Sequence, residues 1–457
     1  MNLLKLPWGL LLFLALAFCS TSTEAQNIKR KPFLGAAFQK TDNFLSVTKV
    51  FEGSTAYKLG IQETDKILSI NAIVFSQVQD VVAYIPTLSV GAPIEIKVLR
   101  DNKKLTLKGI VQPKLMETSP TGEVIYDEVP FKGGYLRSIV HKPKGEGTFP
   151  AVYYIQGYPC SSVDYASSPK NPSKQAIDHW VARGFVVYRV EKPGMGESTN
   201  TPSCETIDFE TEIAAFEAGL LALQSYKFIK KEQIFLFGHS LGGLVAPVLS
   251  AKHDLGGVMV YGTLAVSWYE YLLDLHRYQS EFFGQDYEEI DNDVRNVYDF
   301  LYDWLVKRVP LNDMKANKDY EAIFNNPNNS IGFSNNQVIG RSFDFFPSVS
   351  AISYYKAWKN TKEPVLAMYG EHDIQALSPQ GAETIARIIN HYHPGNGTFL
   401  LLQDTEHLFL SVPDMATNAK MVADQSIFQT YWLENFNTQL TTQTVSWMNK
   451  VIAAQKP

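Results

Sequence analysis

The sequence predicts an α/β domain with a mostly parallel sheet, preceded by a small, mainly β unit. Beyond residue 124, short apolar runs rich in Val, Tyr, Phe and Leu alternate with helical segments, and this alternation is typical of an α/β domain. Several of the runs are apolar at almost every position, as strands buried on both faces are. Before residue 115, short alternating strands dominate and one clear helix is expected.

The composition is that of a folded, globular protein. The chain has 457 residues, of which 45% are hydrophobic and 19% are charged, and this length predicts one to three domains. The formal net charge is −6, and the one basic cluster is Lys29–Lys31. A nucleic-acid-binding protein is expected to carry a larger basic surface. We therefore expect no nucleic-acid partner.

Residues 1–25 have the pattern of a secretory signal peptide. Lys5 precedes the apolar stretch Leu10–Phe18, which is too short to span a bilayer well, and Ala25 ends an acceptable cleavage pattern. Cys19 raises the alternative of a lipid anchor, but Phe18 stands where a small residue is needed. We expect a secreted protein with no membrane span once the signal is removed.

The mainly β unit covers residues 30–114. It contains the segments GSTAYKLGI, DKILSIN and VLRDNKKLTL, with a helix expected at Val78–Ile85 and a hairpin turn at Asp101–Asn102. These segments resemble those of a PDZ domain of the bacterial envelope-protease kind. One position departs from the family, since Thr64 precedes Asp65 where glycine is frequent. Together with the signal peptide, this resemblance implies a bacterial periplasm or cell envelope.

The PDZ resemblance implies a peptide partner. PDZ domains add an extended peptide to a sheet edge, and the turn that binds the peptide carboxylate corresponds here to Leu34, Gly35, Ala36 and Ala37. The alternative is a PDZ fold that serves only as a docking or spacing module.

A linker at residues 115–123, with breakers around Ser119–Pro120, leads into the α/β domain at residues 124–457. The strand–helix alternation stops between about residues 267 and 359. The first half of this interval is predicted to be helical, and the second half is predicted to be loop-like. An insertion between two sheet strands indicates a mainly helical cap.

The segment Gly238-His239-Ser240-Leu241-Gly242 follows a buried strand and precedes a helix. A nucleophilic serine on a sharp strand-to-helix turn needs small residues two positions away on both sides, and Gly238 and Gly242 meet this need. The alternative is an ordinary strand–helix turn with a capping serine.

A serine nucleophile needs a base, and the base needs an orienting carboxylate. Glu371 and Asp373 follow a predicted strand in the segment YGEHD, and His407 lies in the segment TEHLF after the last predicted strand. His372 precedes the acid and is expected to be a loop residue, while His239 is expected to pack beneath the turn.

Five ordered segments, IQGYP, VEKPGMGES, FGHSLGG, YGEHD and TEHLF, resemble those of the α/β-hydrolases over about residues 124–457. Within that family the chain most resembles capped serine aminopeptidases and esterases. The resemblance implies a triad in the chain order Ser240, Asp373, His407, and it favours Asp373 over Glu371. It also implies acyl transfer through an acyl-enzyme, without a cofactor. No histidine pair has convincing metal-ligand spacing, so no metal is expected.

The resemblance also implies the groups around the triad. The oxyanion would accept hydrogen bonds from the amides of Leu241 and Tyr158. The family usually has His-Gly before the second donor, and this chain has Gln156 and Gly157, but the backbone donor needs no particular side chain there.

The two cysteines outside the signal peptide are expected to form a disulfide. Cys160 follows the oxyanion turn and Cys204 follows the glycine-rich segment, so the bond would brace the mouth of the site, and export permits it. The alternative is two buried free thiols.

The substrate stays open between three hypotheses. The first is a secreted hydrolase of small esters or peptides, the second is a peptidase whose PDZ domain captures substrate C-termini, and the third is an inactive envelope binding protein. Acidic residues of the cap would suit a substrate amine, or would form a solvated helix face. They are Glu281, Asp286, Glu288, Glu289, Asp291 and Asp293.

Overall fold

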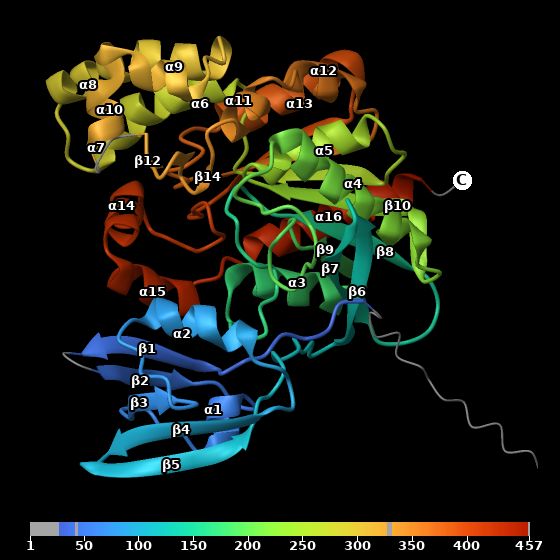
Figure 1. The fold of residues 1–457 in the computed structure, drawn as a ribbon. Helices are drawn as coiled ribbons and strands as arrows, with labels where there is room; N and C mark the ends of the chain where they lie inside the picture. The colour runs from blue at the N-terminus through green and yellow to red at the C-terminus, as the bar shows by residue number, and fades with distance from the viewer. Residues whose placement is uncertain (1–26, 42–43, 327–330, 456–457) are drawn as a thin grey trace, which may run out of the picture.

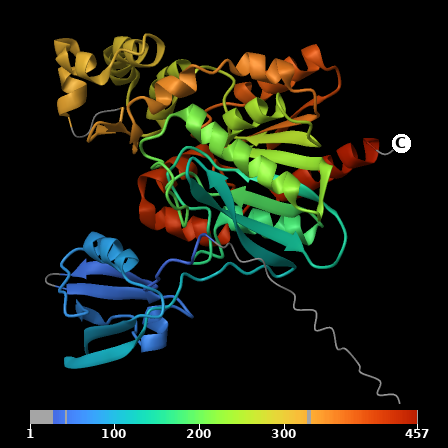
Figure 2. The ribbon, with the colours of Figure 1, turned by 45° about the vertical axis from the view of Figure 1, so that its right-hand side comes forward.

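The computed structural model describes residues 27–41, 44–326 and 331–455, so the predicted signal peptide lies outside the described residues. The small β domain and the cap lie at opposite ends of the molecule, with the large α/β domain between them (Figures 1 and 2). A peptide groove on the small domain and a site beneath the cap are therefore separate regions of this structure.

The small domain is a five-stranded antiparallel sheet in the order β1-β2-β3-β4-β5. Its strands alternate in burial, and in β4 the side chains of Ile94, Ile96 and Val98 fill the core. Thr64 adopts φ +72°, a left-handed conformation that glycine adopts more easily. The elements are β1 (Ala36–Thr41), β2 (Phe44–Val50), α1 (Thr55–Leu59), β3 (Lys66–Ile70), α2 (Val78–Tyr84), η1 (Ile85–Thr87), β4 (Pro93–Arg100) and β5 (Lys103–Ile110).

The large domain is built on an eight-stranded sheet in the order β6-β7-β9-β8-β10-β11-β15-β16. Only β7 runs antiparallel to both of its neighbours, and the strands from β9 to β16 are parallel. The strands are β6 (Gly122–Phe131), β7 (Gly134–Pro143), β8 (Phe149–Ile155), β9 (Val186–Val190), β10 (Ile229–His239), β11 (Gly257–Tyr261), β15 (Val365–Gly370) and β16 (Gly397–Leu402).

Helices cover both faces of this sheet, which explains why its central strands are apolar throughout. Helices α3 and α16 pack on one face, and α4, α5 and α13 pack on the other, with α12 against α5 and α13. This architecture confirms the predicted α/β-hydrolase fold. The helices are α3 (Pro172–Ala182), α4 (Phe209–Ser225), α5 (Gly242–Ser250), α12 (Tyr354–Asn360), α13 (Gln380–Tyr392), α14 (Met415–Ala423), α15 (Gln425–Glu434) and α16 (Gln439–Ala454).

The cap is mainly helical, but its second half is more ordered than the predicted loop. It contains a three-stranded sheet of two-residue strands, which are too short to produce an alternating sequence pattern. The elements are α6 (Trp268–Asp274), η2 (Leu275–Gln279), α7 (Ser280–Phe282), α8 (Tyr287–Leu301), η3 (Tyr302–Val306), α9 (Leu311–Ala316), η4 (Lys318–Tyr320), α10 (Glu321–Asn325), β12 (Phe333–Ser334), β13 (Gln337–Val338), β14 (Arg341–Ser342) and α11 (Phe345–Ser350).

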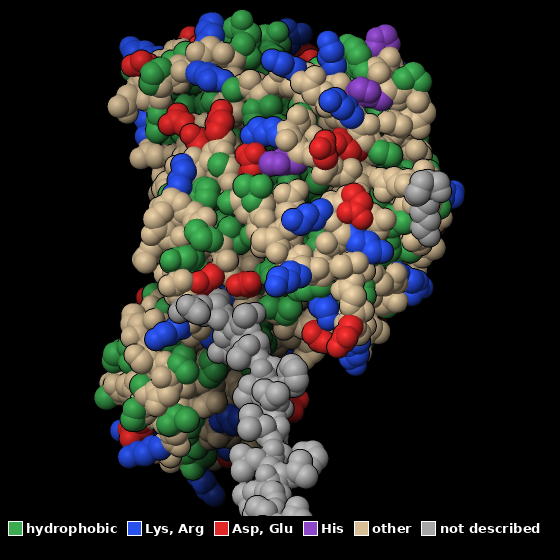
Figure 3. Space-filling view, turned by 90° about the vertical axis from the view of Figure 1, so that its right-hand side faces the viewer, with side chains coloured by type: hydrophobic (Ala, Val, Ile, Leu, Met, Phe, Trp, Pro, Cys, Tyr) green, Lys and Arg blue, Asp and Glu red, His purple; other side chains and the backbone are tan. Residues whose placement is uncertain are grey.

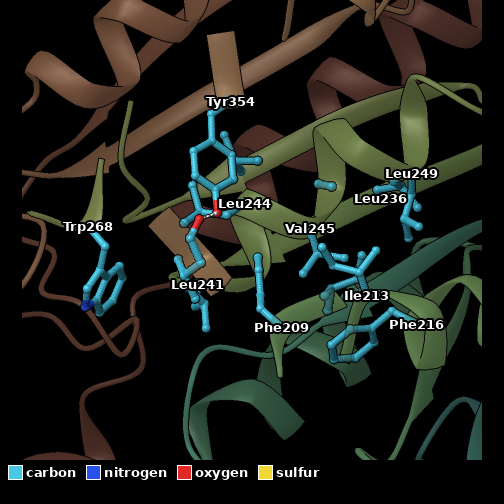
Figure 4. Close-up of a cluster of buried hydrophobic side chains, with 14 of the residues drawn as sticks. Phe209, Ile213, Phe216, Leu236, Leu241, Leu244, Val245, Leu249, Trp268 and Tyr354 are labelled. Carbon is cyan, nitrogen blue, oxygen red and sulfur yellow. Dashed lines mark hydrogen bonds between the residues drawn. The ribbon is translucent and has the colours of Figure 1, made fainter. Parts of the chain in front are cut away.

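The hydrophobic core of the cap is continuous with the hydrophobic core between the sheet and helices α4 and α5. One buried cluster contains Trp304 and Phe346 of the cap together with Leu244 and Val245 of α5. Figure 4 shows part of this cluster, with Leu244 of α5 beside Tyr354 and Val245 of α5 beside Ile213 of α4. The cap is therefore packed onto the domain as part of one hydrophobic core.

The surface carries charges of both signs. On the face shown in Figure 3, acidic and basic side chains are interspersed, without a continuous basic patch. Within the described ranges, no helix is both long enough and apolar enough to span a bilayer.

Candidate active site

Ser240 lies on a strained turn between β10 and α5. Its φ is +54°, a left-handed value that costs free energy in a residue with a side chain. The turn closes tightly around its glycines, because a β-carbon on Gly238 would lie 2.5 Å from the Gly242 oxygen, and one on Gly242 would lie 2.2 Å from the Ile155 oxygen. The predicted strand–turn–helix geometry is therefore present at Ser240.

His407 and Asp373 are paired. His407 Nδ1 lies 2.8 Å from Asp373 Oδ2 and 3.0 Å from Oδ1, and both side chains are buried. Asp373 Oδ1 also accepts hydrogen bonds from the backbone amides of Gln375 and Ala376, at 2.9 and 2.8 Å. The carboxylate is thereby fixed toward the imidazole, although 34 residues separate the two in sequence.

The pKa values of the site follow from burial and this pairing. Burial acts to lower the pKa of His407, but the Asp373 carboxylate and Glu406 together outweigh burial, and the pKa is raised above its ordinary value. His239 lies beneath, where burial and the neighbouring His407 lower its pKa to about 3. Its Nε2 donates to the His407 backbone oxygen at 2.9 Å. His239 is thus a neutral support beneath the imidazole of His407.

Ser240 and His407 line one narrow pocket, whose cavity volume is about 20 Å³. Between their described side chains no hydrogen bond is present, and such contacts often tighten only when substrate binds. The pocket wall is largely apolar and includes Leu241, Leu244 and Trp268. Figure 4 shows Trp268 across from Leu241 and Leu244. A cavity of this volume has room for about one water molecule.

Two backbone amides near Ser240 have no acceptor among the described residues, namely those of Tyr158 and Leu241. The turn that carries Tyr158 passes close to the serine, since a β-carbon on Gly157 would lie 3.1 Å from Ser240 Cβ. Unpaired donors at this place suit an oxygen that becomes negative.

A disulfide joins Cys160 and Cys204. It connects the loop after β8, which carries Tyr158, to the segment after β9. The pairing proposed from the sequence is therefore the one in the structure.

The alternative acid and histidine lie away from the His407–Asp373 pair. The side chain of Glu371 is partly exposed and accepts the Asp404 amide at 3.0 Å. With His372 and Asp404 it forms a surface group whose ligand atoms lie within 4.8 Å of one another, a geometry that also occurs in surface groups without an ion.

The cap contacts the loop that carries Asp373. Tyr271 Oη donates to the Gln375 oxygen at 3.0 Å, and Gln279 Nε2 donates to the Ile374 oxygen at 3.1 Å. These two residues were not found from the sequence, since nothing in their helical segment distinguishes them from other cap residues.

A larger chamber of about 570 Å³ adjoins this pocket and shares Thr263, Leu264 and Tyr271 with it. Its charged lining residues are Asp274 and Glu281. The other acidic residues predicted as candidates are not in its lining.

Those remaining acidic residues belong to the start and surface of α8. Asp286 caps the helix together with Glu289, and Asp291 pairs with Arg295. Most of the acidic residues named as candidates therefore form a solvated helix face, as the second interpretation of the sequence proposed.

The predicted carboxylate-binding turn leads into β1, the edge strand of the small sheet. Ala36 and Ala37 begin the strand, and α2 packs against it. The Leu34 and Gly35 amides donate to no acceptor in the described part of the chain.

Comparisons with known proteins bear on both domains. Residues 32–111 match the family described as PDZ domain. A segment of 136 residues is 28% identical to esterase EstD of Thermotoga maritima, and the match covers 30% of this chain and 32% of that protein. The chain thus spans about a third of the length of this relative.

Solved structures similar to this chain include Est1E from Butyrivibrio proteoclasticus, with a TM-score of 0.42 and 11% identity over 72% of this chain and 99% of that one. Proline iminopeptidase from Mycobacterium smegmatis aligns with a TM-score of 0.41 and 16% identity, over 72% of this chain and all of that one. Both scores are below 0.5, so the strand order and the turn at Ser240 define the fold. The chain combines a PDZ domain at residues 32–111 with a capped domain of the α/β-hydrolase fold.

Proposed function

We propose that the protein is a serine hydrolase that cleaves ester or amide bonds, with Ser240 as nucleophile, His407 as base and Asp373 as the orienting acid. The observation that carries the proposal is the buried His407–Asp373 pair, whose histidine lines the same pocket as a serine on a strained turn. The sequence match to esterase EstD supports the same class of reaction.

In this mechanism, His407 Nε2 takes the hydroxyl proton of Ser240 as Oγ attacks the carbonyl carbon. The amides of Leu241 and Tyr158 stabilise the negative oxygen. The bond to the leaving group then breaks, and the leaving group takes the proton from His407. A water molecule, deprotonated by His407, attacks the acyl-enzyme and releases the acid and Ser240. These steps require no cofactor.

The pockets favour small substrates. The pocket at Ser240 is narrow and largely apolar, and the adjoining chamber of about 570 Å³ has room for a small molecule. Neither lining includes a residue of the PDZ domain, and that domain lies at the far end of the molecule from the cap (Figure 1). This arrangement supports the small-substrate hypothesis over direct transfer of a peptide from the PDZ groove to Ser240.

A peptidase specific for a free amine is the second candidate. Asp274 and Glu281 are the charged residues in the chamber lining, and both are acidic. An ammonium group in the chamber would meet attractive charges, so substrates with a free α-amine would be favoured over their N-acetylated forms.

The PDZ domain is proposed to bind a peptide C-terminus. The free Leu34 and Gly35 amides would hold the carboxylate, and the peptide would pair with β1. A fluorescent peptide that loses binding when its C-terminus is amidated would support this role, whereas equal binding of both forms would favour a spacer. We also propose export to a bacterial envelope, which cell fractionation tests.

The central experiment is labelling with a fluorophosphonate probe, applied to the wild type, Ser240→Ala and His407→Ala. We expect label on the wild type alone, with turnover of p-nitrophenyl acetate. The ratio of ester to aminoacyl-p-nitroanilide turnover then separates esterase from peptidase. An unlabelled and inactive wild type would reject the proposal and favour the binding-protein hypothesis.

A further inference from the structure

A buried charged cluster lies against the turn that carries the second oxyanion donor. It consists of Lys192, Glu212 and Arg341, each at most 1% exposed. Lys192 Nζ lies 2.9 Å from Glu212 Oε1, and Arg341 Nη2 pairs with Glu212 Oε2. The three charged side chains come from the segment after β9, from α4 and from the cap, and they meet out of contact with water. Burying charges in this way costs free energy unless each group is paired.

Lys192 also contacts the turn itself. Its Nζ donates to the Gly157 oxygen at 2.6 Å and to the Tyr158 oxygen at 3.1 Å. The Gly157 carbonyl and the Tyr158 N–H are the two ends of one planar peptide group, and they point in opposite directions. A charged donor on the carbonyl therefore fixes the direction of the N–H and polarises it, since hydrogen bonds in a chain strengthen one another.

Arg341 holds the same turn from the cap. Its Nη1 donates to the Tyr158 oxygen at 2.9 Å and lies 3.3 and 3.1 Å from the sulfurs of Cys160 and Cys204. The guanidinium also stacks on the Phe345 ring, 3.5 Å from its centroid. The carbonyls of both Gly157 and Tyr158 are thus held by cations, and the N–H of Tyr158 is left free.

We propose that Lys192 is a positioning residue of the oxyanion hole. Its ammonium, held by Glu212 beside Arg341, orients and polarises the Gly157–Tyr158 peptide so that the Tyr158 amide stabilises the oxyanion. The proposal rests on the serine hydrolase function proposed above. The competing explanation is that the cluster only fastens the cap to the domain.

The charge on Lys192 is sensitive to pH. Burial lowers its pKa to about 8, against the raising effect of Glu212 from α4, and Arg341 from β14 lowers it further. Deprotonation would remove the charge from the Gly157 carbonyl, so kcat is expected to fall as the pH rises through about 8. A cluster that only fastens the cap would give a loss of stability without this titration of kcat.

The experiment compares the wild type with Lys192→Met, which keeps a straight side chain and leaves Glu212 and Arg341 as a balanced pair, and with Lys192→Arg. The matched control is Lys174→Met, since Lys174 is also buried and paired, with Asp178 at 2.5 Å. The measurements are kcat and KM for p-nitrophenyl acetate, the inhibition constant of phenylboronic acid, and the melting temperature.

We expect Lys192→Met to lower kcat roughly 10-fold with little change in KM, a smaller loss than the roughly 10²–10³-fold loss for removal of an oxyanion donor. The inhibition constant of phenylboronic acid, which forms a tetrahedral adduct, should rise by a similar factor. Lys192→Arg should recover part of kcat and move the alkaline decline to higher pH. Lys174→Met should lower only the melting temperature.

Wild-type kcat and boronate affinity in Lys192→Met would overturn the proposal, as would an unchanged alkaline decline in Lys192→Arg. If Lys192→Met does not fold, the pH profiles of the wild type and Lys192→Arg decide alone. An inactive, unlabelled wild type would instead reject the serine hydrolase function, so the two failures are distinguishable.

Discussion

Arg30 Nη1 lies 2.5 Å from Glu197 Oε2 and 3.2 Å from Asp164 Oδ2. Arg30 immediately precedes the PDZ domain, whereas Glu197 and Asp164 lie in the two loops that the Cys160–Cys204 disulfide connects. The carboxylates are nearly fully buried, with 2% of each side chain exposed. The segment that leads into the PDZ domain is thus ion-paired with the two loops that the disulfide connects.

Replacing Arg30 with Gln is predicted to loosen the PDZ domain from the hydrolase domain. The free energy that holds the two domains together should fall by less than the roughly 3–5 kcal/mol that is lost when a buried ion pair is broken. The loss is smaller because Arg137 and Lys114 still face the carboxylates. Small-angle X-ray scattering should show a larger maximum dimension, with turnover of small esters unchanged. The control is Lys97→Gln, which removes an exposed ion pair with Glu95. Superimposable scattering of the variant and the wild type would contradict the prediction.

Replacing Gly262 with Ala is predicted to disrupt the catalytic pair. A β-carbon there would lie 2.8 Å from Asp373 Oδ2 and 2.9 Å from His407 Nδ1, and the φ of +59° adds strain. We expect kcat to fall by at least about 100-fold, because loss of the orienting carboxylate from a triad costs about 10⁴ even when the geometry is kept. Gly395→Ala is the control, since its φ is +89° with no atom within 4 Å. Equal activity of the two variants would show that crowding at the pair is unimportant.

The rate is predicted to rise with pH through a pKa above the ordinary value of 6.5. Burial acts to lower the pKa of His407, but Asp373 and Glu406 together raise it more, and only the neutral imidazole can accept the serine proton. The pH profile of kcat/KM measures this pKa. In Asp373→Asn the residual activity should titrate at lower pH, because the charge that favours imidazolium is gone. An unshifted profile would mean that Asp373 does not act on His407.

Stability is predicted to decrease between about pH 4.5 and pH 7 because of Glu191. Burial raises the pKa of this carboxyl to about 7, against the hydrogen bonds from Ser162 and the Val163 amide. A group whose pKa is higher in the folded state contributes stability below its unfolded pKa, and that contribution is lost as the pH rises through the folded value.

Glu191→Gln should therefore reduce the change in the free energy of unfolding over this pH range by on the order of 3 kcal/mol at most. Denaturant unfolding at several pH values measures the difference, with Glu123→Gln as an exposed control, since 58% of the Glu123 side chain is accessible. If the two variants lose stability in parallel with the wild type, the Glu191 carboxyl does not titrate in this range.

Much of the site was predictable because its signals are local. The turn at Ser240 needs a buried strand, two glycines and a helix within a few consecutive residues, and each of these leaves a pattern in the sequence. The PDZ strands likewise show alternating polarity. The short strands of the cap could not be found this way, because two residues cannot show a period, and the loop prediction there was wrong for Phe333–Ser342.

The sequence by itself determined the two fold types, the strained turn and the candidate acid and histidine, since these depend on periodicity, sterics and chain order. Only the tertiary structure decided which carboxylate meets His407, and only it brought Arg341 to Glu212 across 129 residues. It also placed Lys192 on the carbonyl opposite the Tyr158 N–H. The physical reason is that ion pairs, burial and shifted pKa values arise from contacts between segments far apart in the chain, which no local pattern encodes.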